Sequence, residues 1–414
     1  MEVPETKYVP SKNKKIDIES LQSKTQEELI EIIRQLQAHN EQLKAIISKN
    51  CGVEKHDHDH RKNNDFDFSR CKWSHILLKL VYFGWDYQGY VCQDDTLDTI
   101  EHHLIQALLK CRLIKSRETS NYHRCGRTDK GVSSFSQVIS ITVRASDEEK
   151  NPLDYCKMLN RLLPDDIKVI CWQPVAEEFS ARFNCNNRTY RYFFPKGDLD
   201  IEAMQEGTGY LLGTHDFRNL CKMDVGNGVT NFIRTIDHAA VSKLEDFHYQ
   251  GTGYDMYFFE LKSQAFLWHQ VRCIVAVLLL IGRKLEKPCV FNDLLDITKN
   301  PRKPQYPMAH PIGLNLFLTE FECGNWILDE AEISRVIETL QKHWTMNTIK
   351  VTHIKSSILE LSKVVSKEIN AQDSVLLRQE SKIYKPLLTR NKCSTLEEKI
   401  CHFVKRRRIK ENVE

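Results

Sequence analysis

Apolar residues in the first part of the chain's body have the spacing of strands and of helices in turn. Continuous or alternating apolar runs, typical of strands, occupy residues 76–83, 138–143 and 167–175. Helical spacing is found over residues 153–163, before Pro164, and at Leu97, Ile100, Leu104 and Leu108, where Thr96 is a candidate cap. This order of elements favours an α+β unit over a doubly wound sheet.

A second region further along the chain repeats this order of elements. Strand patterns recur at residues 189–194, 233–241, 256–262 and 314–321. An apolar helix is predicted over residues 268–281. We therefore expect an α+β protein whose body consists of two related halves, residues 73–175 and 176–323, around a largely antiparallel sheet. A functional site would lie in the cleft between the halves.

The first 72 residues are predicted to form a helical extension and a polar linker outside the body. Residues 26–50 carry a heptad seam that includes one polar member, Asn40, and the apolar residues Leu29, Ile33, Leu36, Leu43 and Ile47. A short coiled coil, between subunits or against the body, and an amphipathic helix on its own domain both fit this seam. Residues 51–70 are polar, and the alternating His and Asp of residues 56–60 are more typical of a solvated linker than of a metal site.

Residues 324–414 are predicted to form a helical C-terminal extension. From Trp326 onward the sequence is charged and helical in pattern, and we expect its end to be a weakly structured tail. Residues 405–408 read Lys-Arg-Arg-Arg, and Lys410 follows. Such a basic cluster is typical of nuclear import or RNA contact, and a solvated charged terminus fits equally well.

The composition narrows the class of protein. Hydrophobic residues make up 41% of the chain and charged residues 28%, as in soluble globular proteins. No apolar run reaches the ~18 residues of a membrane span, and no apolar signal segment opens the chain. We therefore expect no membrane association and a location in the nucleus and/or cytoplasm. Because the net charge is only +3, any RNA contact must come from a locally basic cleft.

Fourteen cysteines are spread along the chain without a Cys-x-x-Cys pair. Without a signal segment they are expected to be reduced thiols. The ligand spacing of a structural zinc site is missing, and so is a glycine-rich phosphate-binding loop. We therefore expect no metal site and no cofactor.

The segment of residues 124–134 carries the clearest candidate chemistry. Asp129 lies there between two glycines, without a large apolar anchor and just before a predicted strand, a common place for a catalytic group. A carboxylate used as a nucleophile must be ionised, which requires a nearby cation. Arg127 lies on the same side of an extended backbone. Arg272, at the predicted junction of a strand and a helix, is a second candidate, although alone it reads as a surface cation.

Residues 179–183 and 188–192 combine aromatic and arginine side chains. In a strand, Tyr190 and Tyr192 point to one face and Arg191 to the other. Interleaved rings and guanidinium groups suit a nucleic acid, because rings stack on bases and arginines contact phosphates. Core-facing tyrosines explain the local pattern equally well.

Several of these segments together resemble the TruA-type tRNA pseudouridine synthases. The run Gly-Arg-Thr-Asp-Lys-Gly-Val at residues 126–132 is similar to the signature of that family, and the resemblance extends over residues 73–323. Further matching segments, in the family's order, are residues 179–183, 188–192, 211–217, 234–236 and 265–272. The resemblance implies the pseudouridine synthase fold for the body, tRNA as the partner, and a homodimer.

The resemblance also implies roles for individual residues. Asp129 would be catalytic and act at the ribose, either by adding to C1′ or by removing the C2′ proton. Arg272 would be its ionic partner, and Tyr190 would stack on the target uracil and is a candidate acceptor of the C5 proton. Arg127 and Arg188 join Tyr190 and Arg272 as candidate substrate-binding residues. The target base must first leave its stack, and the isomerisation itself needs no metal.

Within the family, the form of residues 125–133 is closer to the eukaryotic branch, which modifies positions 38 and 39 of tRNA. Lys130 and Ser133 depart from the usual bacterial residues, and the helical N-terminal extension also resembles this branch. The alternatives are a synthase acting at other tRNA positions, a catalytically inactive RNA-binding relative and a coiled-coil interaction protein. A phosphoenzyme using Asp129 is a more distant alternative, because no nucleotide-binding loop accompanies it.

Overall fold

A computed structural model of the chain describes residues 66–147, 152–225, 228–245, 253–377 and 383–411. Asp67–Glu414 form one compact unit. The predicted heptad segment, the His-Asp run of residues 56–60 and most of the polar linker lie outside the described residues.

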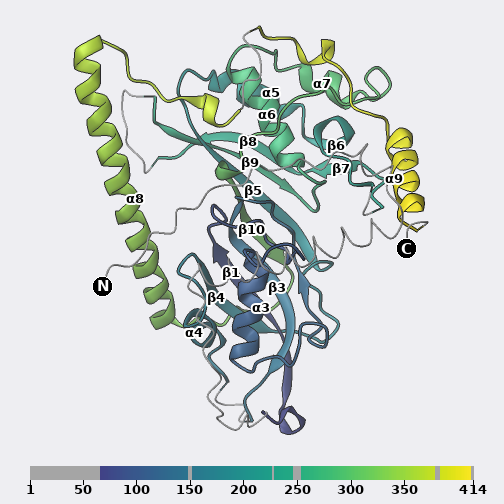
Figure 1. Ribbon diagram of the computed structural model, residues 1–414, viewed down its shortest axis with the longest axis vertical. Helices are drawn as coiled ribbons and strands as arrows, with labels where there is room; N and C mark the ends of the chain where they lie inside the picture. Colours follow the sequence, from purple (N-terminus) through teal and green to yellow (C-terminus); the bar gives the residue numbers. More distant parts are fainter. Residues whose placement is uncertain (1–65, 148–151, 226–227, 246–252, 378–382, 412–414) are drawn as a thin grey trace, which may run out of the picture. The chain divides into compact units, whose positions relative to one another are not determined.

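One sheet runs through both predicted halves of the body (Figure 1). Its order is β4-β1-β3-β10-β5-β9-β8, and β2 pairs with β3. Its strands are β1 (Trp73–Tyr82), β2 (His123–Arg124), β3 (Ser133–Arg144), β4 (Ile167–Pro174), β5 (Cys185–Pro195), β8 (His238–Lys243), β9 (Met256–Ser263) and β10 (Leu314–Phe321). Neighbouring strands are antiparallel except β3 and β10. The predicted α+β fold with a largely antiparallel sheet is confirmed.

The first half of the sheet packs against two helices, α3 (Ile100–Lys110) and α4 (Tyr155–Asn160). Alternate residues of β1 and β3, among them Ile76 and Ile141, are fully buried in this core. The two residues are paired across the strands, so that the apolar side chains of β1 and β3 face the same side. Burial of each such side chain stabilises the fold by about 1.5–3 kcal/mol.

The second half of the sheet packs against α5 (Ile201–Gly209) and α6 (Gln270–Gly282) (Figure 1). The helix predicted over residues 268–281 is confirmed as α6, but it begins two residues later, at Gln270. Every residue of α6 is buried except Arg272. A helix that is apolar all round belongs to the core, so the one arginine in its first turn requires a specific partner.

The single strand predicted over residues 233–241 is wrong. The chain forms β7 (Ile233–Ile236) and β8 there, and β7 leaves the main sheet to pair with β6 (Gly213–Asp216). Asp237 lies between the two strands and donates its backbone N–H to a carbonyl of β9 at 2.9 Å. Apolar alternation could not show this break, because both pieces have the composition of strands.

The start of α3 also differs from the prediction. Its cap is Thr99, not Thr96, and the Thr99 hydroxyl accepts a hydrogen bond from the backbone N–H of His102 at 3.3 Å. Leu97 lies outside the helix and is 68% exposed. The helix predicted over residues 153–163 is shortened to the six residues of α4.

The C-terminal part of the chain contains α8 (Glu330–Val365), a helix of 36 residues that runs along one side of the body (Figure 1). Its first turn contacts α4, where Asn160 donates to the Glu332 carboxylate at 2.9 Å. The weakly structured tail was a wrong prediction, because α9 (Leu396–Glu411) includes the basic cluster. The remaining helical segments are α7 (Val290–Leu295) and the 3-10 turns Phe68–Arg70, Arg218–Leu220, Pro311–Gly313, Asp373–Val375 and Leu387–Thr389. Within the described part of the chain, no helix has the length and apolar character to span a membrane.

Candidate active site

A cavity of about 1660 Å³ is lined by residues from both halves of the body. Four segments contribute most of its wall: the Asp129 loop (residues 125–132), the beginning of β5, the connection from β9 to α6 (residues 264–272) and residues 310–314. The cavity therefore collects three of the segments that the sequence singled out, although they are far apart along the chain.

The Asp129 loop is held by the connection between β1 and α3. The backbone N–H of Tyr90 donates to the carbonyl of Thr128 at 3.1 Å, and the hydroxyls of Thr128 and Tyr82 lie 2.7 Å apart. Gly131 has a φ of +78°, which favours glycine where the chain reverses just after Asp129. The loop is thus fixed before β3 begins.

Gly84 packs directly against the end of the Asp129 loop. A Cβ atom at this position would lie 2.0 Å from the backbone oxygen of Val132, and the Gly84 N–H donates to the Ser133 hydroxyl at 3.1 Å. We expect Gly84→Ala to lower the free energy of unfolding, measured by urea denaturation, by about 3 kcal/mol. Gly126→Ala is the control, because a Cβ there meets no atom within 4 Å. Equal losses in the two variants would contradict this packing argument.

Two side chains from the start of α6 contact the Asp129 carboxylate. Arg272 Nη1 lies 3.2 Å from Oδ2 of Asp129, and His269 Nε2 lies 3.1 Å from the same oxygen. Burial would raise the pKa of Asp129, but the hydrogen bonds and charges of His269 and Arg272 outweigh it and hold the pKa below its usual value. The Asp129 side chain is 25% exposed. The site therefore presents an ionised, accessible carboxylate that can act as a nucleophile or a base.

Arg272 is fixed from two sides. Its Nε donates to the carbonyl of Ala309 at 2.9 Å, and the backbone N–H of Ala309 donates back to the carbonyl of Arg272 at 3.2 Å. The structure thus brings Arg272 into contact with Asp129 across 143 residues of sequence. Arg127, the neighbour of Asp129 in sequence, is exposed at the cavity wall.

The ring of Tyr190 reaches the cavity from β5. It packs edge-on against Phe266, with ring centroids 5.1 Å apart and an interplanar angle of 89°. Burial raises the pKa of Tyr190 far above its usual value, so its hydroxyl is protonated at neutral pH. Tyr192, on the same face, is fully buried. On this strand, Tyr190 therefore lines the cavity, and Tyr192 packs in the core.

Arg188 ties three segments of the cavity wall together. Its guanidinium donates to the carbonyl of Cys125 at 2.9 and 3.3 Å, to that of Arg182 at 3.0 Å, and to that of Gln264. These carbonyls belong to the Asp129 loop, to the segment before β5 and to the connection that leads to α6. These hydrogen bonds give Arg188 a role in holding the wall, and its role as a substrate-binding residue stays a prediction.

Sequence reasoning missed two residues of this site. His269 stands in the segment of residues 265–272, where the sequence pattern does not distinguish it from its neighbours. Glu101, fully buried in α3, accepts hydrogen bonds from Arg124 at 2.7 Å and from Arg117 at 3.3 Å, and so fixes two arginines of the cavity wall. A carboxylate on the apolar face of α3 was the available signal, because charged residues are rarely buried without a partner.

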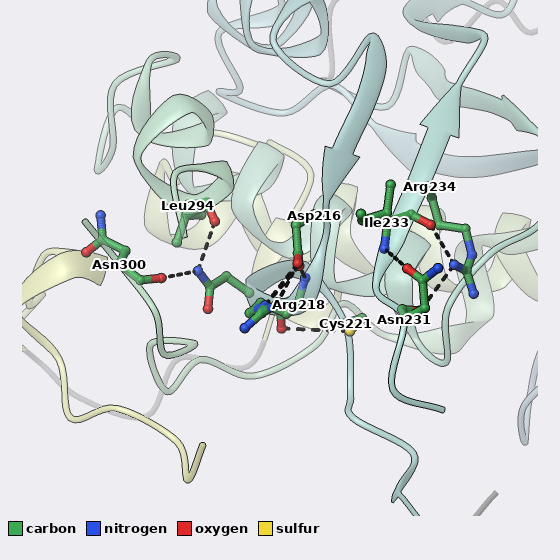
Figure 2. Close-up of polar contacts among 9 residues, drawn as sticks. Asp216, Arg218, Cys221, Asn231, Ile233, Arg234, Leu294 and Asn300 are labelled. Carbon is green, nitrogen blue, oxygen red and sulfur yellow. Dashed lines mark hydrogen bonds and ion pairs between the residues drawn. The ribbon is translucent and has the colours of Figure 1, made fainter. Parts of the chain in front are cut away.

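Polar contacts also anchor the segment that follows β6 (Figure 2). Arg218 binds the Asp216 carboxylate through two nitrogens, the shortest distance being 2.7 Å. The Asn219 side chain donates to the carbonyl of Leu294 at 2.9 Å and to that of Asn300 at 2.7 Å. The segment after β6 is therefore joined to α7 and the residues after it.

The cavity wall is strongly basic although the net charge of the chain is only +3. Arg234 enters it from β7, where its guanidinium donates to two backbone carbonyls (Figure 2). The basic residues of the wall are Arg117, Arg124, Arg127, Lys130, Arg182, Arg188, Lys222, Arg234 and Arg272, and its acidic residues are Asp129 and Asp224. Exposed rings stand among them at Trp85, Phe183 and Trp268. The expected basic cleft is present, and its rings suit unstacked bases.

Metal-ligating residues are not gathered in the described part of the chain, where no group of three or more His, Cys, Asp or Glu side chains is placed to hold a metal ion. The cysteines in this part are free thiols. Most of them are buried or half-buried, including Cys125 at the beginning of the Asp129 loop.

Comparison with known proteins finds relatives along most of the chain. A family model described as tRNA pseudouridine synthase matches residues 209–322. A human protein named tRNA pseudouridine(38/39) synthase is 42% identical over 92% of this chain and 88% of its own length. A Saccharomyces cerevisiae protein of the same name is 41% identical over 63% of this chain and 60% of its own. A tRNA pseudouridine synthase A from Methanosarcina mazei is 32% identical over 64% of this chain and 92% of its own.

Proposed function

The chain belongs to the tRNA pseudouridine synthase family, and on that premise we propose that it isomerises uridine to pseudouridine in the anticodon stem-loop of tRNA. The observation that carries this proposal is the Asp129 carboxylate, held ionised by Arg272 and His269 in a basic, aromatic cavity. We propose positions 38 and 39 as the targets, because the names of the human and yeast relatives specify them.

The reaction breaks the C1′–N1 bond, turns the uracil and joins C5 to C1′; the hydrogen on C5 leaves as a proton, and N1 takes up a proton from water. Asp129 would act at the ribose, by adding to C1′ or by removing the C2′ proton. Either step needs an ionised carboxylate, which the low pKa of Asp129 supplies. Tyr190, whose ring lies in the cavity wall, would stack on the uracil and is a candidate acceptor of the C5 proton.

The proposed substrate must give up one base from its stack. Flipping a base out costs a few kcal/mol, and stacking of one base on an aromatic ring returns about 1–3 kcal/mol. Tyr190 is the proposed partner of the flipped uracil. The basic residues of the wall are the proposed partners of the flanking phosphates, and they would make binding weaken as salt rises.

A transcript labelled with 5-³H-uridine tests this proposal, because each isomerisation releases the C5 hydrogen. We expect the purified protein to release tritium from a tRNA with uridine at 38 or 39, and to release much less when both positions are cytidine. A protein that binds the transcript without releasing tritium would be an inactive RNA-binding relative, which would overturn the proposal. Undiminished release of tritium from the cytidine transcript would show that the protein modifies uridines at other positions of the tRNA.

We also propose that the protein is a homodimer, as the family resemblance implies. Between Trp344 and Leu361, α8 carries a row of exposed apolar residues at successive spacings of seven, three, four and three: Trp344, Val351, Ile354, Ile358 and Leu361. Such a row is typical of a contact between two helices. The α8 helix of a second copy is its proposed occupant.

Charged residues within this row should separate the proposed dimer. Ile354→Glu combined with Leu361→Glu is expected to shift the sedimenting species from dimer to monomer, because two carboxylates would be buried in an apolar contact. Ser356→Glu, an exposed position of α8 outside the row, is the control and should leave the dimer intact. A dimer that survives the double change would place the interface elsewhere, and a monomeric wild type would contradict the homodimer itself.

The proposed location is the nucleus and/or the cytoplasm. The basic cluster of residues 405–408 and a tRNA substrate support it. Imaging of a fluorescent fusion of the full chain, with and without that cluster, tests the proposal.

A further inference from the structure

We propose that His269 is a positioning residue of this site: together with Arg272 it fixes Oδ2 of Asp129, so that Oδ1 is the oxygen presented to the ribose. This inference rests on the function proposed above and adds which oxygen of the carboxylate acts. The contacts of His269, its backbone conformation and its packing all direct the imidazole at Asp129.

The two donors converge on one oxygen. His269 Nε2 and Arg272 Nη1 lie 3.1 and 3.2 Å from Oδ2 of Asp129. Among the described residues, no hydrogen bond to Oδ1 is found. Two donors at fixed positions set the plane of the carboxylate, and a reacting group gains most from being held in the geometry of attack. The oxygen without a donor is then the one free to meet the substrate.

The backbone of His269 is strained. Its φ of 59° and ψ of 12° place it in the left-handed region, which residues with side chains rarely adopt and which recurs at functional sites. His269 precedes α6 as its N-cap residue, yet its side chain makes no capping hydrogen bond. The turn is held by Gln270, whose side-chain oxygen accepts from the backbone N–H of Leu267 at 2.8 Å. This conformation serves to aim the imidazole at Asp129 instead of at the helix.

The ring of His269 is held in place by its neighbours. It packs on Trp268 with centroids 4.6 Å apart and a tilt of 36°, and its side chain is only 10% exposed. Lys222 Nζ lies 4.1 Å from the centroid of the Trp268 ring. The charged groups around the imidazole are therefore Asp129 in the loop, Arg272 in α6 and Lys222 behind Trp268.

The two ring nitrogens of His269 are used unequally. Nε2 must carry a proton in order to donate to a carboxylate. Nδ1 is buried and has no hydrogen-bond partner among the described residues. Buried polar atoms are normally paired, so a histidine kept only for packing should satisfy both nitrogens. This inequality favours a role at Asp129 over a role in packing alone.

His269 and Arg272 differ in what else they hold. Arg272 also binds the Ala309 carbonyl, so its loss disturbs the cavity wall as well as the carboxylate. The contacts described for His269 are those with Asp129 and Trp268. A change at His269 therefore isolates the orientation and ionisation of Asp129.

The test compares the wild type with His269→Ala, with His269→Gln, and with His102→Ala on α3 as a matched control. The first readout uses full-length protein with ¹³C-labelled Asp carboxyls and no tRNA, and Asp129→Asn assigns the signal of Asp129. We expect the pKa of Asp129 to rise in His269→Ala and to return part of the way in His269→Gln, which keeps a neutral donor. His102→Ala should leave it unchanged.

The second readout is single-turnover pseudouridine formation across pH. His269→Ala should lower the rate about 10²-fold, with the dissociation constant for tRNA within about threefold of the wild type. The reaction uses the ionised carboxylate, so activity is lost as the pH falls through the pKa of Asp129. A higher pKa therefore moves this loss to higher pH.

The two readouts test the positioning role of His269 separately from the proposed pseudouridine synthase function. An unchanged pKa of Asp129 in His269→Ala would overturn the positioning role, and so would a wild-type rate and pH profile. A raised pKa in a protein whose wild type forms no pseudouridine would support the positioning role and overturn the proposed function.

Discussion

Asp129→Asn is expected to lower the rate of pseudouridine formation by about 10⁴-fold or more, because an amide can neither attack C1′ nor remove the C2′ proton. The change keeps the shape of the side chain and an oxygen that can accept from Arg272 and His269. The affinity for tRNA should therefore change by less than about threefold, or ~0.6 kcal/mol. Single-turnover tritium release and filter binding of the same transcript measure the two quantities.

Asp224→Asn provides the control for this loss. Asp224 is another acidic residue of the cavity wall, and it is not one of the residues that contact the Asp129 carboxylate. Its replacement should leave the rate within about tenfold of the wild type. If Asp129→Asn also stayed within that range, Asp129 would have no part in the chemical step.

Arg272→Ala is expected to lower kcat about 10²-fold, a loss as large as that expected for His269→Ala. Without Arg272 the carboxylate is no longer held in the geometry of attack, and a misplacement of about 1 Å can cost about 10²-fold in rate. The Arg272 charge helps to keep the pKa of Asp129 low, so without it the pKa rises. Activity, which is lost as the pH falls through this pKa, should then be lost at a higher pH than in the wild type. The measurement is kcat as a function of pH.

Arg127→Ala is the matched control for Arg272→Ala. Both are arginines of the cavity wall, but Arg127 is exposed and Arg272 contacts the carboxylate. Arg127→Ala should raise KM and leave the acid limb of the pH profile in place. A shift of the acid limb in Arg127→Ala, with none in Arg272→Ala, would show that Arg127 is the ionic partner of Asp129 and that Arg272 is not.

Strands with a continuous apolar or alternating pattern were predictable from the sequence. The predicted run of residues 76–83 became β1, and that of residues 314–321 became β10, because burial of one face sets the register of a strand. The break at Asp237 was not predictable, since it depends on β7 pairing with β6 in a second sheet. The cap of α3 was misplaced because Thr96 and Thr99 are equally good caps in isolation.

Residues of the candidate site that belong to a sequence motif were predictable. Residues whose role depends only on their contacts in the folded chain were not. Asp129 stands out in its loop, and the family resemblance already pairs it with Arg272, whereas the local pattern alone leaves Arg272 a surface cation 143 residues away. His269 was missed because a left-handed histidine before a helix leaves no periodic signal in the sequence. The part of Arg188 in holding the wall was not predictable, because its acceptors are backbone carbonyls of three separate segments, which no side-chain pattern reveals.

Mapping pseudouridine in tRNA shows whether this chain isomerises a uridine of the anticodon arm. Unmodified tRNA would be incubated with the purified full-length protein, and every uridine would be read at single-nucleotide resolution. We expect pseudouridine at positions 38 and 39 with the wild type and none with Asp129→Asn. Unchanged uridines with the wild type, or pseudouridine confined to another arm of the tRNA, would contradict the proposed function.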